Sequence, residues 1–138
     1  MLLKIDDKTN IKKIDKNQRL ITREEIAHEL QVNPFGRYLL ELKDGKIIAY
    51  LYYSDIYDRA EINQIEVETS YRNQKIATKL LQEMLKNIKK DITLEVRKDN
   101  FPAIHLYKKF GFKKTAIRQS YYQGTDGILM ERKNGDSY

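Results

Sequence analysis

The chain has 138 residues, of which 41% are hydrophobic, so it is long enough to bury the core of one ordinary domain. It has no cysteine, which excludes thiolate catalysis, disulfides and cysteine-bound zinc, and only two histidines could act as acid–base groups or metal ligands. No apolar run approaches the roughly 18 to 20 residues of a membrane span. Charged residues interrupt the N-terminal segment too soon for a signal peptide, so we expect none. We therefore expect a cytoplasmic protein without metal or membrane span, whose chemistry rests on carboxylates, tyrosines, hydroxyls or backbone.

The net charge is +6, from 26 Lys and Arg against 20 Asp and Glu. Such a balance suits a polyanionic partner such as RNA, a ribosome or a phosphorylated cofactor. Many lysines, however, fall where a solvated helix face is expected, as in residues 86–90. No RNA-binding motif with interleaved aromatics and glycines is present, so we expect no dedicated nucleic-acid surface.

The first third of the chain predicts a short strand and helices. Apolar residues at 2–5 start the strand, and the lysine-rich segment 11–20 carries apolar residues that can mark one face of a helix. Thr22 is the expected N-cap of a second helix, because an acidic first turn follows it. That helix should end before Asn33, which precedes a proline.

A meander of strands follows. Residues 38–42 and 47–53 are apolar runs on either side of the Asp44-Gly45 dipeptide, a pattern that predicts a hairpin. Residues 60–67 form a third run, which extends the hairpin.

The junction after this third strand is the most informative feature of the sequence. The strand passes through a short polar turn directly into an amphipathic helix, and the first N–H groups of a helix have no intrahelical partner. The junction is therefore suited to hold an anion such as a phosphate. The residues spaced to pack this helix on a sheet are Ala77, Leu80, Leu81, Met84, Leu85 and Ile88.

The last part of the chain predicts a strand, a short helix and two more strands. Residues 92–97 alternate between apolar and polar, which places Glu95 on the face opposite the apolar side chains. Asn100 is the expected N-cap of the short helix, with a proline in its first turn, and Gly111 should end it. The order of elements predicts an α+β or mixed α/β domain with helices covering a sheet.

Several segments together resemble a known family. These are 65–67 leading into 71–77, and Leu-Glu-Val-Arg at 94–97 leading to Asn100 and to Leu-Tyr-Lys-Lys-Phe-Gly-Phe at 106–112. Over residues 20–133 the chain resembles the GNAT superfamily of acetyl-CoA-dependent N-acetyltransferases. With Arg-Gln-Ser-Tyr-Tyr at 118–122 and Thr-Asp-Gly at 125–127, it looks most like the bacterial ribosomal-protein-alanine N-acetyltransferases.

The resemblance implies a single N-acetyltransferase domain over residues 1–138, with a mixed, mostly antiparallel sheet of about six or seven strands flanked by about four helices. It implies acetyl-CoA as the donor and, as acceptor, the N-terminal alanine of a small-subunit ribosomal protein. Because no cysteine can carry an acyl group, we expect direct transfer in a ternary complex. Acetylation of a small amine, or a non-catalytic acyl-CoA-binding regulatory domain, remain alternatives.

The resemblance also implies a cofactor site. The strand backbone pairs with the pantetheine arm, the loop holds the pyrophosphate, and an asparagine of the short helix contacts the cofactor. The residues concerned are Ile65, Glu66, Val67, Arg72, Asn73, Gln74, Lys75, Ile76, Ala77, Thr78 and Asn100.

Lys75 departs from the family pattern, which has a glycine at this position of the loop. Glycine allows close approach of backbone N–H groups to the phosphates and relaxes the demands of the turn. A lysine fits without strain if its dihedral angles are helical or near-helical, and it then adds a positive charge beside the phosphates.

Acetyl transfer to an amine needs two catalytic groups, a base and an acid. An α-amino group has an unperturbed pKa of about 7.7 to 8.0, so a base must accept its proton, and a thiolate leaving group needs an acid. By resemblance Glu95 is the base, with Glu61 second and Glu66 third, and Tyr107 is the acid. The structural alternative for Glu95 is a surface position or an ion pair near Arg97.

Two further pairs of residues, two tyrosines and the two histidines, lie outside these assignments. Tyr121 and Tyr122 in the last hairpin are candidates to line a peptide-substrate groove, with packing alone as the alternative. His28 and His105 have no acid or ligand partner by spacing, and we assign them no role.

Overall fold

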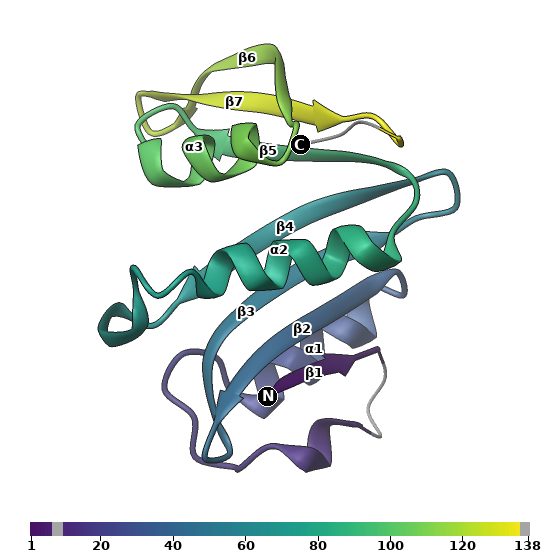
Figure 1. Ribbon diagram of the computed structural model, residues 1–138, viewed down its shortest axis with the longest axis vertical. Coiled ribbons are helices and arrows are strands. Elements are labelled where there is room, and N and C mark those ends of the chain that lie inside the picture. Colours follow the sequence, from purple (N-terminus) through teal and green to yellow (C-terminus); the bar gives the residue numbers. More distant parts are fainter. Residues whose placement is uncertain (7–9, 136–138) are drawn as a thin grey trace. The chain divides into compact units, whose positions relative to one another are not determined.

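The computed structural model describes residues 1–6 and 10–135 (Figure 1). Seven strands form one sheet in the order β1-β2-β3-β4-β5-β7-β6. This confirms the expected mixed, mostly antiparallel sheet. The elements are β1 (Leu2–Ile5), the 3-10 turn η1 (Asn10–Lys13), α1 (Arg23–Val32), β2 (Gly36–Lys43), β3 (Lys46–Asp55), β4 (Arg59–Val67), the 3-10 turn η2 (Thr69–Tyr71), α2 (Ile76–Asn87), β5 (Asp91–Arg97), α3 (Phe101–Lys109), β6 (Lys113–Tyr122) and β7 (Thr125–Arg132).

The chain divides into two compact units. The first unit comprises Met1–Asp55 and Asn63–Ile88, and the second comprises Ile56–Ile62 and the chain from Lys89 onward. Strand β4 contributes its first half to the second unit and its second half to the first.

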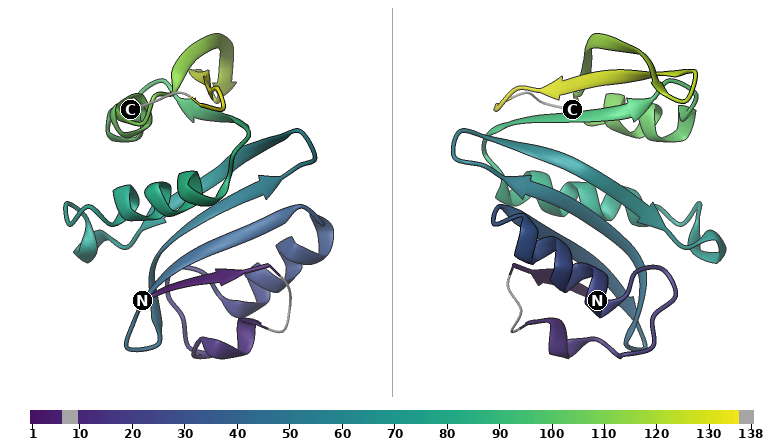
Figure 2. Two further views of the ribbon diagram at one scale, coloured as in Figure 1. Left: turned by 45° about the vertical axis from the view of Figure 1, so that its right-hand side comes forward. Right: turned by 180° about the vertical axis from the view of Figure 1, so that it is seen from behind.

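In the first unit, α1 and α2 cover opposite faces of the strands (Figures 1 and 2). Strands β1, β2 and β3 pair in antiparallel fashion. Because successive side chains of a strand point to opposite faces, β2 supplies both layers of the core. Its residues Tyr38 and Leu40 belong to the buried cluster that includes Ile26 of α1.

Three predicted local features of the first unit are confirmed. Thr22 caps α1 in a capping box with Glu25, and Asn33 ends the helix. Asp44 and Gly45 have φ angles of 52° and 78°, as a type I′ hairpin turn requires. Helix α2 buries Leu80, Leu81, Met84 and Leu85.

The helix predicted over residues 11–20 is wrong. Only Asn10–Lys13 are helical, and they form a 3-10 turn, so the described chain has three α-helices and not about four. Ile11 and Ile14 are buried as expected. They lack apolar partners a further turn along, and the polar residues Asp15 and Asn17 favour turns over helix.

In the second unit, β5 is a central strand. It pairs in parallel with β4 from Arg59↔Asp91 to Ile62↔Leu94, and antiparallel with β7, which pairs with β6. Ile92, Leu94 and Val96 are buried, which confirms the alternation of this strand. Helix α3 is fixed at its C-terminal end by Arg132, whose Nε donates to the Phe110 carbonyl at 2.8 Å.

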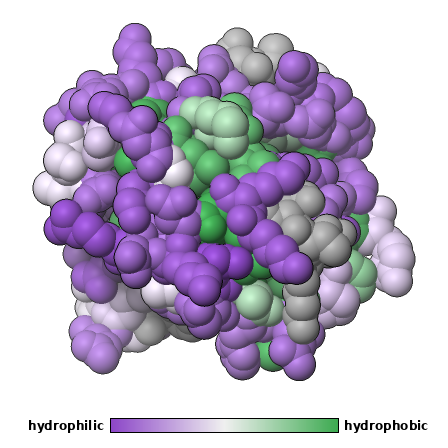
Figure 3. Space-filling view, turned by 90° about the horizontal axis from the view of Figure 1, so that it is seen from below, coloured by the Kyte–Doolittle hydropathy of each residue, from purple (hydrophilic) through white to green (hydrophobic). Residues whose placement is uncertain are grey.

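Charged side chains cover much of the surface. The face in Figure 3 is mostly hydrophilic, with a smaller hydrophobic area between the hydrophilic groups. In the described ranges, 1–6 and 10–135, no helix has both the length and the apolar content needed to cross a bilayer.

Candidate functional site

The predicted phosphate loop, defined here as residues 72–78, follows the 3-10 turn η2 and runs into the first turn of α2 in the first unit. Helix α2 begins at Ile76, and no side chain caps its N-terminus. Residues 72–75 are exposed, whereas Ile76, Ala77 and Thr78 are partly buried. A helix N-terminus without a side-chain cap presents N–H donors and a positive dipole end to an incoming anion.

Two residues of the loop have left-handed backbone conformations. Asn73 has a φ of 65°, and Lys75, the N-cap of α2, has φ 59° and ψ 26°. The condition under which a lysine fits here without strain, helical or near-helical dihedral angles, is therefore not met. A positive φ is the reason that glycine suits this position, and a lysine there carries a strain of about 1 kcal/mol.

The loop is tied back to the strand that precedes it. The Nε atom of Arg72 donates to the carbonyl oxygen of Val67 at 3.2 Å. Ile65, Glu66 and Val67 are partly buried and lie past Ile62↔Leu94, the last pair of the register between β4 and β5. The first unit thus brings the predicted pantetheine strand and the phosphate loop together.

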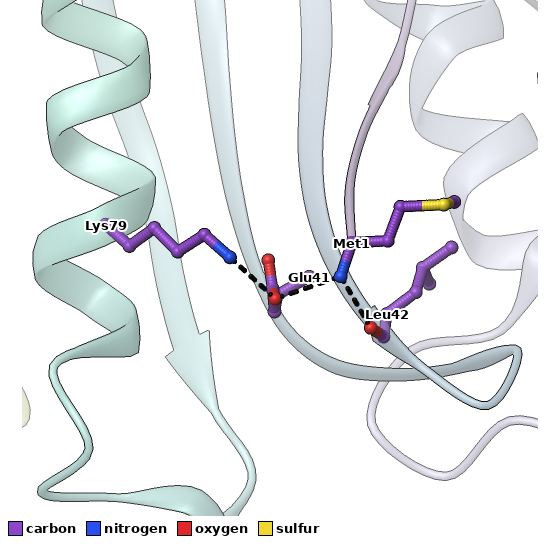
Figure 4. A network of polar contacts seen from close by, with 4 residues as sticks. All are labelled: Met1, Glu41, Leu42 and Lys79. Carbon is purple, nitrogen blue, oxygen red and sulfur yellow. Dashed lines mark hydrogen bonds and ion pairs between the residues drawn. The ribbon is translucent and has the colours of Figure 1, made fainter.

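An ion pair holds the helix of this loop on the sheet (Figure 4). Lys79 of α2 donates to Glu41 Oε1 of β2 at 2.9 Å, and the Met1 amino group lies 3.1 Å from the same oxygen. Burial opposes the ionisation of Glu41, but these two hydrogen bonds outweigh it and hold the pKa of the carboxyl below its usual value.

Glu95 lies on the central strand of the second unit, with 18% of its side chain exposed. Its Oε1 atom is buried and lies 3.1 Å from Arg118 Nε on β6, an ion pair whose angles do not make a hydrogen bond. A Cβ atom at Gly127 of β7 would lie 3.3 Å from the Glu95 carboxyl carbon. The last hairpin therefore both pairs the carboxylate and leaves room for it.

Arg97 is not the ion-pair partner of Glu95. Its guanidinium donates two hydrogen bonds of 2.9 Å each to Asp99. The roles of Arg118 and Gly127 could not be predicted locally, because both residues are distant from Glu95 along the chain. Their positions in the quoted hairpin motifs were the only indication.

The other candidate bases lie in different places. Glu61 pairs with Thr93 across β4 and β5. Residues opposite each other share a face of the sheet, so Glu61 and Glu95 lie on the same face in the second unit. Glu66 belongs to the first unit, where it lines a cavity together with Gln64 and Tyr50.

Tyr107 lies in α3 of the second unit with only 6% of its surface exposed. Its ring centroid is 5.6 Å from that of Phe112. Burial raises the pKa of the Tyr107 hydroxyl to about 12, so this group is protonated at neutral pH. Within the part of the chain that the structure describes, no hydrogen bond to this hydroxyl is found, which leaves its proton available to a ligand.

Asn100 and the last hairpin are further parts of the second unit for which the sequence predicted a role. Asn100 caps α3 by accepting from the Ala103 N–H at 3.3 Å, and Gly111 has a φ of 90°, so both predicted ends of this helix are confirmed. The ring of Tyr122 lies below the Arg97 guanidinium at 5.6 Å. The Tyr121 side chain lies outside the described part of the structure. Of the two histidines, His28 lines the cavity of Glu66, and His105 is exposed.

Cations gather next to the phosphate loop. A cavity of about 630 Å³ is lined by the four cations Lys16, Arg19, Lys43 and Lys46 against the two carboxylates of Asp44 and Glu68, and also by Ser70 and Tyr71, directly before the loop. By contrast, in residues 1–6 and 10–135 no three His, Asp or Glu side chains gather as metal ligands. The first unit is therefore electrostatically suited to a ligand with several phosphates.

Comparison with known proteins assigns the class of this fold and site. The sequence profile described as Acetyltransferase (GNAT) family matches residues 6–112, and the chain belongs to this family.

Individual known proteins are similar to this chain in sequence or in fold. The chain is 37% identical over 115 residues to a Bacillus subtilis (strain 168) protein named as a ribosomal protein bS18-alanine N-acetyltransferase, covering 79% of this chain and 76% of the relative. The fold of this chain is similar to that of the ribosomal-protein-S18-alanine N-acetyltransferase from Escherichia coli, with a TM-score of 0.76 at 23% identity. The match covers 100% of this chain and 97% of that one. A GNAT family acetyltransferase from Elizabethkingia anophelis with acetyl-CoA bound gives a TM-score of 0.68 at 23% identity, covering 81% of this chain and 83% of that one.

Proposed function

We propose that this acetyltransferase moves the acetyl group of acetyl-CoA to the N-terminal amine of a protein, specifically the N-terminal alanine of a small-subunit ribosomal protein. The N-terminus of α2, which has no side-chain cap and follows β4 after the 3-10 turn η2 and a short loop, is the observation that carries the donor site. The acceptor is inferred from the name of the Bacillus subtilis relative at 37% identity. Such an acceptor implies a cytoplasmic enzyme, and we propose that residues 1–138 act as one acetyltransferase domain.

The donor is held mainly by backbone groups in this proposal. The N–H groups of residues 73–78 bind the pyrophosphate, and Arg72 and Lys75 add positive charge. The backbone of Ile65, Glu66 and Val67 pairs with the amides of the pantetheine arm as an additional strand would. Asn100 contacts the cofactor from the start of α3.

The chemistry is carried by side chains. Glu95 accepts the proton of the acceptor amine, directly or through a water molecule, and the amine nitrogen attacks the thioester carbonyl carbon. The new C–N bond forms as the C–S bond breaks, and Tyr107 donates its proton to the departing thiolate. The hydroxyl suits this task because it is protonated at neutral pH and has no other hydrogen bond within the described residues.

A calorimetric titration with acetyl-CoA, followed by mass spectrometry of an alanine-initiated peptide, tests the proposal. We expect saturable binding and the addition of one acetyl group to the peptide α-amine. A panel of polyamines and free amino acids is the comparison, since substrate choice lies outside the cofactor motif. Preference for a member of that panel would contradict the protein acceptor, and a trapped acetyl-enzyme would contradict direct transfer.

A further inference from the structure

The first unit contains an acidic cavity that the mechanism does not use. This cavity of about 520 Å³ is lined by residues of α1, β2, β3 and β4. None of its lining residues is a lysine or an arginine, although the protein carries a net charge of +6. The residues that give it its character are Tyr38, Tyr50, Tyr52, Glu25, Glu29 and Glu66.

The three tyrosines form a buried aromatic cluster on one side of the cavity. Tyr38, Tyr50 and Tyr52 are 1%, 5% and 9% exposed. The rings of Tyr38 and Tyr52 stack with centroids 4.5 Å apart and planes 5° apart, and Tyr50 lies 5.9 Å from Tyr38 at a tilt of 50°. Aromatic faces attract cations through their quadrupole, and more strongly where water is excluded.

The Tyr38 hydroxyl is a polar group of this aromatic cluster for which the described residues supply no hydrogen bond. Tyr52 donates to Glu29 Oε2 at 3.1 Å and accepts from Asn33 at 2.8 Å, but across the described residues Tyr38 has no such partner for its hydroxyl. Burial, and then the nearby Tyr52 and Glu29, raise the pKa of Tyr38 well above its ordinary value. This hydroxyl is not one of the fully enclosed polar atoms that lack a partner, so it can donate a hydrogen bond to a ligand in the cavity that Tyr38 lines.

Three carboxylates line the same cavity as the aromatic cluster. Glu25 is exposed, whereas Glu29 and Glu66 are partly buried. No three acidic or histidine side chains in the described ranges are close enough to share a metal ion, so these carboxylates are dispersed around the cavity. Dispersed carboxylates over aromatic rings match an extended organic cation better than a small metal ion.

The cavity lies beside the proposed path of the donor. Gln64 and Glu66 of β4 line it, and they flank Ile65, whose backbone we assign to the pantetheine arm. A group held in the cavity is therefore held next to the strand that carries the reactive end of the cofactor. This position favours a part of the acceptor over an unrelated small cation.

We propose that this acidic tyrosine pocket binds a lysine or arginine side chain of the acceptor polypeptide, close to the N-terminal residue that is acetylated. The inference rests on the proposed function and deepens it, because it makes acceptor choice depend on a basic residue next to the acetylated one. The carboxylates neutralise the cation, and the tyrosine rings cover its aliphatic stem and charged end.

Paired peptides test this directly. One alanine-initiated peptide carries arginine shortly after the alanine, and its partner carries citrulline, which keeps the size and removes the charge. For the wild-type protein we expect kcat/KM to fall by about tenfold from arginine to citrulline, mainly through KM. Equal values for the two peptides would overturn the proposal.

The variants separate the pocket from general charge effects. In the double variant Glu25→Gln with Glu29→Gln, the preference for arginine should disappear, so that the two peptides give equal kcat/KM. Glutamine is compatible with the capping box at residue 25 and with the Tyr52 hydrogen bond at residue 29. Glu24→Gln is the matched control, because this exposed residue of the same helical turn is not among the residues that line the pocket. Retained preference in the double variant would also overturn the proposal.

A binding measurement distinguishes failure of the pocket from failure of the proposed function. The arginine and citrulline peptides are titrated by calorimetry onto the protein saturated with CoA, which cannot transfer an acetyl group. Tighter binding of the arginine peptide supports the pocket, whether or not either peptide is acetylated. Absence of acetylation of both peptides refutes the proposed function. Acetylation of both peptides with equal binding refutes the pocket alone.

Discussion

The phosphate loop of the first unit and the Glu95–Tyr107 pair of the second unit use different parts of the polypeptide. The loop presents backbone N–H groups, held by left-handed conformations at Asn73 and Lys75 and by the Arg72 hydrogen bond to Val67. The pair presents a carboxylate and a hydroxyl, held by Arg118 and by burial in α3. Side-chain truncation should therefore be severe in the second unit and mild in the loop.

Glu95→Gln should have the largest effect. Loss of a general base lowers kcat by about 10² to 10³, while the dissociation constant of acetyl-CoA stays within about twofold. Steady-state kinetics and calorimetry measure the two quantities. Glu61→Gln, on the same face of the sheet, is the matched control and should retain most of the turnover. The reverse ranking would make Glu61 the base.

Tyr107→Phe should have the next largest effect, a fall in kcat of about tenfold to hundredfold with little change in acetyl-CoA affinity. Because burial raises the Tyr107 pKa to about 12, the acid stays protonated through the alkaline range. Wild-type kcat should therefore rise as the acceptor amine loses its proton near pH 8 and stay level to about pH 11. A decline that sets in near pH 10 would show that another group is the acid.

Lys75 tests the backbone side of the comparison. Lys75→Gly removes both the charge and the strain of the positive φ, whereas Lys75→Ala removes the charge and keeps the strain. If charge dominates, both variants bind acetyl-CoA a few-fold more weakly. If close backbone approach dominates, Lys75→Gly binds at least as tightly as wild type, and Lys75→Ala binds about as tightly as wild type. Loss of binding in Lys75→Gly beyond about tenfold would contradict a backbone-built site.

The smallest expected effect is on the helix that carries the loop. Lys79→Met should lower the free energy of unfolding by about 1 to 2 kcal/mol, limited by solvent screening because the Lys79 side chain is half exposed. The depressed pKa of Glu41 means that its ion pairs stabilise the fold above pH 4.5 and that this stabilisation is lost as the pH falls below it. The melting temperatures of the wild type and of Lys79→Met should therefore converge as the pH falls. A difference in melting temperature that does not change with pH would exclude the Glu41 contribution.

Much of the fold could be predicted because it depends on local pattern. The capping box at Thr22, the Asp44-Gly45 turn and the ends of α3 follow from residues a few positions apart. The helix over residues 11–20 was wrong because two buried isoleucines do not distinguish a helix face from a loop folded over the core.

The sequence by itself determined the strand-to-helix junction, which depends on a local pattern, and its motifs carried the resemblance that implied the family and the candidate residues. Only the tertiary structure decided that Lys75 is left-handed, that Arg118 and not a neighbour in sequence pairs with Glu95, and that three tyrosines and three carboxylates share one cavity. Each of these depends on strands and helices far apart in the chain, whose register and packing no local pattern encodes.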